Sequence, residues 1–342
     1  VTPMKKILLV AFVAAFTALA ADPPLDKPPE KARKTQLEAF TDPDKASPDY
    51  PVHGEYAGQV PGGPVGCQVV AEGDGKFAGR VLRGGLPAEG WDGKTEVKFT
   101  AKRDDDKVSF AFSTPNGNAV LGTIGGGKVA ATGQDGKAVE LKRVVRHSPT
   151  EGAKPPAGAV VLFDGTSVDA WDKGKVEDGC LSVSVPGGLR SKQAFGDCTV
   201  HVEFRLPFMP KARGQARGNS GVYLQGRYEV QVLDSFGLKG ENNECGGIYE
   251  LHAPLVNMCY PPLQWQTYDV DYTAARYGPD GKKSANARIT VKHNGVLIQD
   301  NVELTRATRA AILPEGPERG PLHLQNHGDP VVYRNVWVVE KK

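Results

Sequence analysis

Strict alternation of apolar and polar residues marks the clearest elements of this chain. In residues 200–206, four apolar residues (Val, Val, Phe and Leu) alternate with the polar residues His201, Glu203 and Arg205. Residues 228–233 show the same kind of alternation. A period of two residues is that of a β-strand, whose successive side chains point to opposite faces. We therefore expect one face of each strand to pack on a second sheet and the other face to be unusually polar.

Tight-turn signals separate many further strand-like runs. The chain has six Asp-Gly and two Asn-Gly dipeptides, which favour hairpins because their turns need positive φ. In the first half of the chain the runs between them are short and regularly spaced, which predicts a small all-β sandwich or barrel. These runs are Gly66–Ala71, Phe77–Leu82, Lys94–Ala101, Lys107–Phe112, Lys128–Thr132 and Ala138–Val145. In the second half, a single helix is expected at 305–313.

Composition divides the chain into domains. Its 342 residues favour two domains, and its 41 glycines and 26 prolines favour short strands over long helices. Residues 21–49 are rich in proline and charge, which predicts a linker, and a second Pro/Gly-rich linker is expected at 148–159. The folded blocks are then a small accessory β domain at 50–147 and a jelly-roll sandwich at 160–342.

Residues 1–20 have the pattern of a signal peptide. Met4-Lys5-Lys6 precedes an apolar run at 7–21, and Ala18-Leu19-Ala20 supplies a small-residue cleavage site. The alternative, an uncleaved membrane anchor, is disfavoured because spanning a bilayer takes roughly 20 residues. No later stretch is apolar enough to span, so we expect a periplasmic or secreted protein with no stable membrane insertion. The near-balance of 42 basic against 40 acidic residues argues against a nucleic-acid partner.

Export places the five cysteines in an oxidising setting. Cys245 and Cys259 bracket one Gly/Pro/Asn-rich loop, which predicts a disulfide between them. The pairing of Cys67, Cys180 and Cys198 stays open, and the alternative is that all five are buried thiols.

The second block contains a set of motifs in a characteristic order. They are Leu162–Ser167, Gly218–Tyr223, Tyr228–Asp234, Cys245–Tyr249, Trp265–Asp269, Leu322–Gly328 and Tyr333–Val336. Together these motifs resemble the 3-keto-disaccharide hydrolase family, formerly the domain of unknown function 1080. The resemblance implies a concanavalin-A-like jelly roll and hydrolysis of glycosides already oxidised at C3. The first block resembles an accessory domain found ahead of this one in secreted planctomycete proteins.

The implied reaction is removal of the C2 proton, elimination of the C1 substituent and addition of water. It needs a base, an electrophile for the enolate oxygen and an acid for the leaving group. Glu229 is the candidate base, His327 the candidate acid and Arg334 the candidate electrophile. The alternatives are a salt bridge between Glu229 and Arg205 or Arg227, a capping or turn role for His327, and an ion pair in which Arg334 holds Glu229 or Asp234 in place.

Substrate contacts are expected from amides and aromatic rings near these groups. The amides of Asn219, Gln231 and Gln325 suit sugar hydroxyls, and Tyr223 and Tyr249 could stack on a sugar ring or belong to the core. We expect Glu229, Gln231, Gln325, His327 and Arg334 to converge on one concave face.

A divalent metal is left open, with His201, Glu203, Glu229 and His327 as its candidate ligands. Two other functional classes also stay open. A carbohydrate-binding module would show a shallow groove with exposed aromatic side chains, and a partner-binding surface protein would show a broad apolar patch on residues 50–147.

Overall fold

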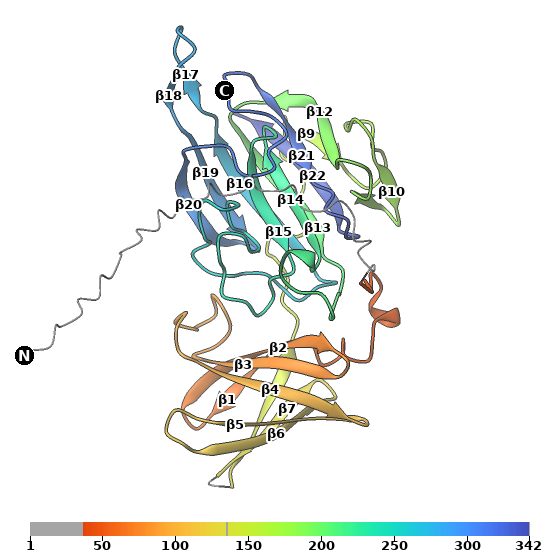
Figure 1. Cartoon of the computed structure of the whole chain (residues 1–342), viewed down its shortest axis with the longest axis vertical. Helices are drawn as coiled ribbons and strands as arrows, with labels where there is room; N and C mark the ends of the chain where they lie inside the picture. Colours follow the sequence, from red (N-terminus) through yellow and green to blue (C-terminus); the bar gives the residue numbers. More distant parts are fainter. Residues whose placement is uncertain (1–36, 135, 342) are drawn as a thin grey trace, which may run out of the picture. The chain divides into compact units, whose positions relative to one another are not determined.

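The structure, a computed structural model, describes residues 37–134 and 136–341. The predicted signal peptide at 1–20 lies outside the described residues. Within the described part, the first block is a closed barrel in which each of eight strands pairs antiparallel with its neighbours in the chain, and the eighth pairs with the first (Figure 1). The strands are β1 (Gly54–Val60), β2 (Gly63–Gly73), β3 (Lys76–Arg83), β4 (Glu96–Asp104), β5 (Lys107–Ser113), β6 (Ala119–Gly125), β7 (Lys128–Gly133) and β8 (Ala138–Val144).

The turn dipeptides act as the sequence predicts. Asp74 and Gly75 connect β2 to β3 with φ of 53° and 70°, the left-handed conformation that tight hairpins require. Short connections of this kind join strands that are adjacent in space. Of the two alternatives left by the sequence, sandwich or barrel, the barrel is therefore the one formed.

The second block consists of two main antiparallel sheets and one small hairpin. The larger sheet has the order β10-β11-β22-β13-β16-β19-β20, with β9 beside β22, and the smaller sheet has the order β12-β21-β14-β15. The bounds are β9 (Val160–Phe163), β10 (Lys175–Glu177), β11 (Cys180–Ser182), β12 (Leu189–Phe195), β13 (Cys198–Arg205), β14 (Asn219–Leu224), β15 (Tyr228–Leu233), β16 (Trp265–Thr273), β17 (Arg276–Tyr277), β18 (Lys283–Ala285), β19 (Ala287–His293), β20 (Val296–Leu304), β21 (Gly320–Leu324) and β22 (Val332–Glu340).

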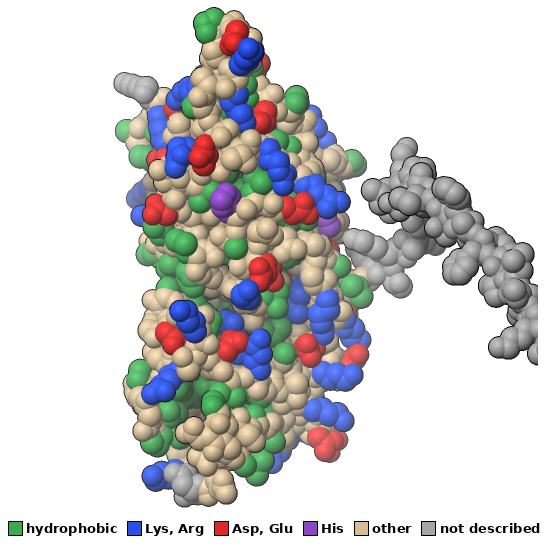
Figure 2. Space-filling model, turned by 60° about the vertical axis from the view of Figure 1, so that its left-hand side comes forward, with side chains coloured by type: hydrophobic (Ala, Val, Ile, Leu, Met, Phe, Trp, Pro, Cys, Tyr) green, Lys and Arg blue, Asp and Glu red, His purple; other side chains and the backbone are tan. Residues whose placement is uncertain are grey.

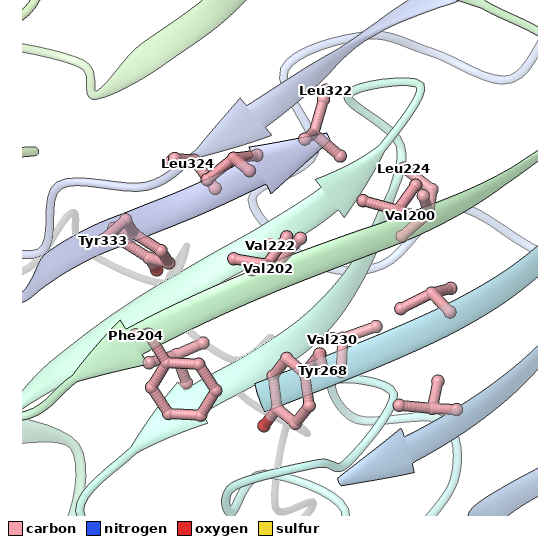
Figure 3. Close-up of a cluster of buried hydrophobic side chains, with 14 of the residues drawn as sticks. Val200, Val202, Phe204, Val222, Leu224, Val230, Tyr268, Leu322, Leu324 and Tyr333 are labelled. Carbon is pink, nitrogen blue, oxygen red and sulfur yellow. The ribbon is translucent and has the colours of Figure 1, made fainter. Parts of the chain in front are cut away.

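The apolar faces of the two main sheets form one core (Figure 3). From the larger sheet Val202 and Phe204 are fully buried, and from the smaller sheet Val222 and Val230 are fully buried against them. This arrangement confirms the predicted all-β jelly-roll sandwich. It also means that the polar faces of the two sheets point away from each other, which decides where the candidate site residues lie.

Other segments have little regular structure. The described helices are single 3-10 turns at Pro43–Lys45 and Gly214–Ala216, and the helix expected at 305–313 is absent. Ala310 has φ of 61°, a left-handed conformation that ends helical winding. No helix within the described ranges is long and apolar enough to cross a membrane.

Candidate active site

The candidate base lies in the middle of a two-stranded pairing on the smaller sheet. β14 and β15 pair so that Tyr223 is opposite Glu229 and Gly221 is opposite Gln231. Their neighbours Val222, Val230 and Val232 belong to the core, so these four residues occupy the face of the sheet that points away from it. We call Gly221, Tyr223, Glu229, Gln231 and Gln325 the Glu229 cluster.

The Glu229 carboxylate is oriented by one tyrosine. The Tyr223 hydroxyl donates to Glu229 Oε2 at 2.7 Å, and Gln325 Nε2 donates to the same hydroxyl at 3.0 Å. Glu229 Oε1 has no hydrogen bond among the described residues. It is not fully buried, so a small part of its surface is accessible. One carboxylate oxygen is thus fixed, and the other can receive a proton from a substrate.

A glycine makes room for that free oxygen. A Cβ atom built on Gly221 would lie 2.2 Å from Glu229 Oε1, much closer than two non-bonded atoms can approach. Any side chain at position 221 would therefore displace the carboxylate. The Gly221–Val222–Tyr223 stretch supplies both the space for Glu229 and the hydroxyl that holds it.

Burial controls the charge of this carboxyl group. Glu229 is only 2% exposed and has no arginine or lysine partner in the described part of the chain, where Arg227 instead donates to the Pro314 carbonyl, so the predicted alternative of a salt bridge to Arg205 or Arg227 is wrong. Loss of hydration raises the pKa of Glu229 to about 8, with the nearby Glu250 charge adding to the rise and the Tyr223 hydrogen bond opposing it. A pKa near neutrality suits a general base.

Two amides extend the polar face along the strands. Gln231 Nε2 donates to Gln215 Oε1 at 2.9 Å, and Asn219 Nδ2 donates to the same oxygen at 3.1 Å. Asn219 Oδ1 is fully buried and has no hydrogen-bond partner among the described residues. Gln215 was not predicted. It lies in the 3-10 turn before β14, and its only sequence signal is a Gly-rich loop.

The remaining predicted residues lie around the Glu229 cluster and differ in how exposed they are. Tyr249 is half-buried, and its backbone N–H donates to the Glu229 carbonyl at 3.2 Å, which places it beside β15. Gln325 follows β21, and its N–H donates to the Gly221 carbonyl at 2.9 Å. His327 lies two residues further along and is exposed. The structure thus brings Tyr223, Gln325 and Tyr249 to Glu229.

Arg334 is not part of this site, contrary to the prediction. It lies on β22 of the larger sheet, where its Nε donates to Glu203 at 2.7 Å and its Nη2 to Glu151 at 2.8 Å. Its guanidinium also lies 3.9 Å from the centre of the Trp265 ring. Arg334 is therefore ion-paired, but with Glu203 and Glu151 and not with Glu229 or Asp234, the partners that the alternative prediction named. Arg334 and Glu229 point away from a common core on opposite sides.

The Arg334 network binds the linker between the two blocks. Glu203 Oε1 accepts from the Gly152 backbone N–H at 2.6 Å, and Asn335 donates to the Ala153 carbonyl at 2.9 Å. The fully buried His201 hydrogen-bonds Asp269 at 2.6 Å. These polar residues of the larger sheet therefore hold residues 148–153 in place.

The possible metal ligands do not converge. His201 and Glu203 lie on the polar face of the larger sheet, while Glu229 lies on that of the smaller sheet. Among residues 37–134 and 136–341, no group of three or more His, Cys, Asp or Glu side chains is arranged to hold a metal ion. The four-ligand site is therefore wrong for this fold.

The predicted disulfide between Cys245 and Cys259 is not formed in the structure, but the two thiols do come together. All five cysteines are free, buried thiols, as the alternative prediction stated. Cys245 and Cys259 interact with each other through their side chains, Cys245 Sγ also contacts the Tyr268 hydroxyl at 3.2 Å, and Cys259 Sγ donates to the Leu233 carbonyl at 3.5 Å. Burial raises the pKa of Cys259 well above its usual value.

Comparison with known proteins places the second block in a family. Residues 158–339, just over half of the chain, match the family described as the 3-keto-alpha-glucoside-1,2-lyase-like domain. A structure from Parabacteroides distasonis, described as a "putative glycosyl hydrolase", is 36% identical, with 54% of this chain and 85% of that chain covered and a TM-score of 0.50. A second structure from that organism with the same description is 16% identical over 54% of this chain and 95% of its own, with a TM-score of 0.40. None of the curated proteins matches. On the family match, this chain is a member of the 3-keto-alpha-glucoside-1,2-lyase-like family.

Proposed function

We propose that this protein cleaves glycosides whose C3 hydroxyl has been oxidised to a ketone, with Glu229 as the base. Family membership and the likeness to a glycosyl hydrolase support a sugar-cleaving, hydrolase-like role in general. The observation that carries the finer proposal is the buried Glu229 carboxyl group, with one oxygen held by Tyr223 and the other without a hydrogen bond among the described residues. Ordinary glycosidases instead need two carboxyl groups that flank the bond.

The chemistry follows from the acidity of the carbon next to a ketone. Glu229 Oε1 takes the C2 proton, and the electron pair of the C–H bond forms an enolate. The enolate then expels the C1 substituent, which takes up a proton as it leaves, and addition of water across the new double bond completes net hydrolysis. Because the pKa of Glu229 is about 8, roughly one tenth of the molecules carry the ionised base at pH 7.

Side chains around the base can serve the other steps. Gln325 Nε2 has two hydrogens and uses one on Tyr223, so the second can donate to the enolate oxygen. The role of His327 as the acid stays a prediction, supported by its position in the loop that also carries Gln325.

Two features bear on the competing functions. Among the described residues, the most exposed large apolar side chains are all Leu or Val, so no aromatic side chain is in that set. On residues 50–147, Leu121 and Val145 belong to it, and the other partly exposed apolar side chains of this block include those that line the barrel cavity.

The test is turnover of a 3-keto-glucoside by matched variants. Glu229→Gln keeps the size and the Tyr223 contact but removes basicity, so kcat/KM should fall by about 10²–10⁴-fold. Glu315→Gln is the control, because Glu315 also accepts a tyrosine hydroxyl, from Tyr228 at 2.7 Å, but lies away from the Glu229 cluster. Full activity of Glu229→Gln would reject Glu229 as the base. Failure of the wild type to cleave the 3-keto-glucoside would reject the proposed substrate class.

Export to the periplasm or the medium belongs to the same proposal, since it rests on the Met4-Lys5-Lys6 and 7–21 pattern. Mass spectrometry of the protein isolated from its native cells checks it. A mature N-terminus near residue 21 is expected, and an intact N-terminal segment would contradict cleavage.

A further inference from the structure

The inner face of the barrel can be followed from strand to strand by register. Tyr56 pairs with Cys67, Cys67 with Val81, and Val81 with Val97. The same face continues through the pairs Phe110–Gly122, Gly122–Ala131 and Ala131–Val139. Nearly all of these residues are apolar or glycine, so the sequence alternation of each strand builds an apolar lumen.

The lumen is filled at one end and open at the other. Tyr56, Val69 and Phe77 are fully buried and close one end. At the other end, the inward-facing apolar side chains are partly exposed. These residues are Val60, Val81, Val97, Phe112, Val120, Ala131 and Val139. They line a cavity of about 900 Å³, within the range of small-molecule sites. Figure 2 shows hydrophobic side chains gathered around a hollow in the lower part of its view.

Two glycines keep this space open. A Cβ atom on Gly79 would lie 2.1 Å from the ring of Phe99, and one on Gly122 would lie 2.2 Å from the ring of Phe110. Each ring therefore lies flat against the glycine of a neighbouring strand. The two rings are 4.8 Å apart and lie along the barrel wall, so they do not fill the lumen.

The polarity of the lining changes from the interior to the mouth. The deep lining is aliphatic and aromatic apart from the Cys67 thiol, and burial keeps that thiol neutral by raising its pKa to about 12. Hydroxyl and amide side chains appear only near the hairpin ends, at Thr114, Asn116, Asn118 and Gln134. A ligand in the deep part would thus meet no hydrogen-bond partner, whereas one at the rim would meet several.

We propose that this barrel binds an amphiphile, with a single hydrocarbon chain in the lumen and its polar head at the rim. Covering the exposed valine and phenylalanine surface gives the hydrophobic driving force. The rim amides and hydroxyl can hydrogen-bond a carboxylate, hydroxyl or glycerol head. The same chain chemistry occurs in a free fatty acid and in a single-chain lipid. This site is separate from the Glu229 cluster and does not rest on the function proposed for it.

Adjacent alanines on β7 allow a matched test. Ala131 faces the lumen and pairs with Val139, whereas Ala130 is exposed and pairs with Glu140. Nile red fluorescence is measured with the full chain, followed by displacement with decanoate, decanol and a single-chain lysophospholipid. Wild type and Ala130→Trp should bind the dye equally, and Ala131→Trp should weaken binding by at least tenfold with an unchanged circular dichroism spectrum.

The outcomes separate the alternatives. Displacement by decanoate and decanol alone identifies a free-chain ligand, and displacement by the lysophospholipid as well extends the ligand class to lipids. No dye binding by the wild type, no displacement by any of the three, or equal binding by the two tryptophan variants overturns the proposal. If Ala131→Trp does not fold, Val120→Phe narrows the same lumen and is judged by the same criterion.

Discussion

Glutamine at position 229 should change how stability depends on pH as well as activity. A neutral glutamine has nearly the shape of a protonated glutamate, so Glu229→Gln removes the ability to ionise and little else. Glu229 is 2% exposed, and burial raises its pKa from 4.5 to about 8. The wild-type fold therefore loses stability wherever the unfolded chain releases this proton and the folded chain keeps it.

The sign and size follow from proton linkage. A folded pKa above the unfolded value gives stability that is fully present below pH 4.5 and is lost as the pH rises to about 8. At 1.36 kcal/mol per pKa unit, the loss between pH 4.5 and 8 is about 4 kcal/mol. Glu229→Gln has no such loss. Between pH 4.5 and 8, its free energy of unfolding should therefore rise relative to that of the wild type by about 4 kcal/mol, which corresponds to about 10 °C in melting temperature for a domain of this size.

Tryptophan fluorescence is a suitable assay because three of the four tryptophans, Trp171, Trp265 and Trp337, lie in the second block. Wild type, Glu229→Gln and the control Glu315→Gln are unfolded in urea at pH 4.5, 6 and 8. All other titrating groups contribute equally to the pH dependence of stability in the wild type and the variant, so their contributions cancel in the comparison. If the wild-type and Glu229→Gln stabilities stay parallel across this range, Glu229 has an ordinary pKa and the burial argument is wrong.

Four further predictions follow from the site and the fold. Activity on a 3-keto-glucoside should rise with pH up to about 8, because only the ionised Glu229 can take a proton, and a pH-rate profile that is flat from 6 to 9 would contradict this. Gly221→Ala should lower kcat/KM by at least tenfold because its Cβ displaces Glu229 Oε1, whereas Gly196→Ala, whose Cβ would lie an ordinary contact distance of 3.8 Å from Arg319 Nε, should not. Arg334→Gln should leave kcat/KM within a few-fold of wild type, since Arg334 binds Glu203 and Glu151, and a loss as large as that of Glu229→Gln would return it to the active site. Residues 155–342 expressed alone should unfold cooperatively, as expected of a separate domain, and an insoluble or molten product would refute this.

Local patterns predict the strands well because alternation and turn chemistry act over a few residues. The polar face of 228–233 is visible in the sequence, and it carries Glu229 and Gln231 where the structure needs them. The sequence does not say which of two sheets a strand joins. Arg334 follows Tyr333 just as Glu229 follows Tyr228, yet β22 pairs with β13 of the larger sheet, so Arg334 lies on the opposite side of the core.

Long-range contacts explain the other differences. Gln215 is 16 positions from Gln231 and meets it only because β14 and β15 fold back on each other. The disulfide prediction assumed that two cysteines bracketing a loop would bond, and the Cys245 and Cys259 side chains do meet in the core, where they are free thiols that interact with each other. The barrel cavity could not be predicted either, since it depends on Phe99 and Phe110 lying over glycines of other strands.

Neighbouring strands of the barrel are consecutive in the chain, so the residues that pair the strands differ from the turn residues around the opening of the cavity. The β1–β2 and β5–β6 turns and the ends of β7 and β8 all lie on the rim of the cavity, whereas the ladder hydrogen bonds that close the barrel lie along the strands. Substitutions at Asn116 or Asn118 therefore touch the entrance without changing strand pairing. Related chains could diverge in ligand preference through these few turn positions while they keep the same barrel, so variation among relatives should concentrate there.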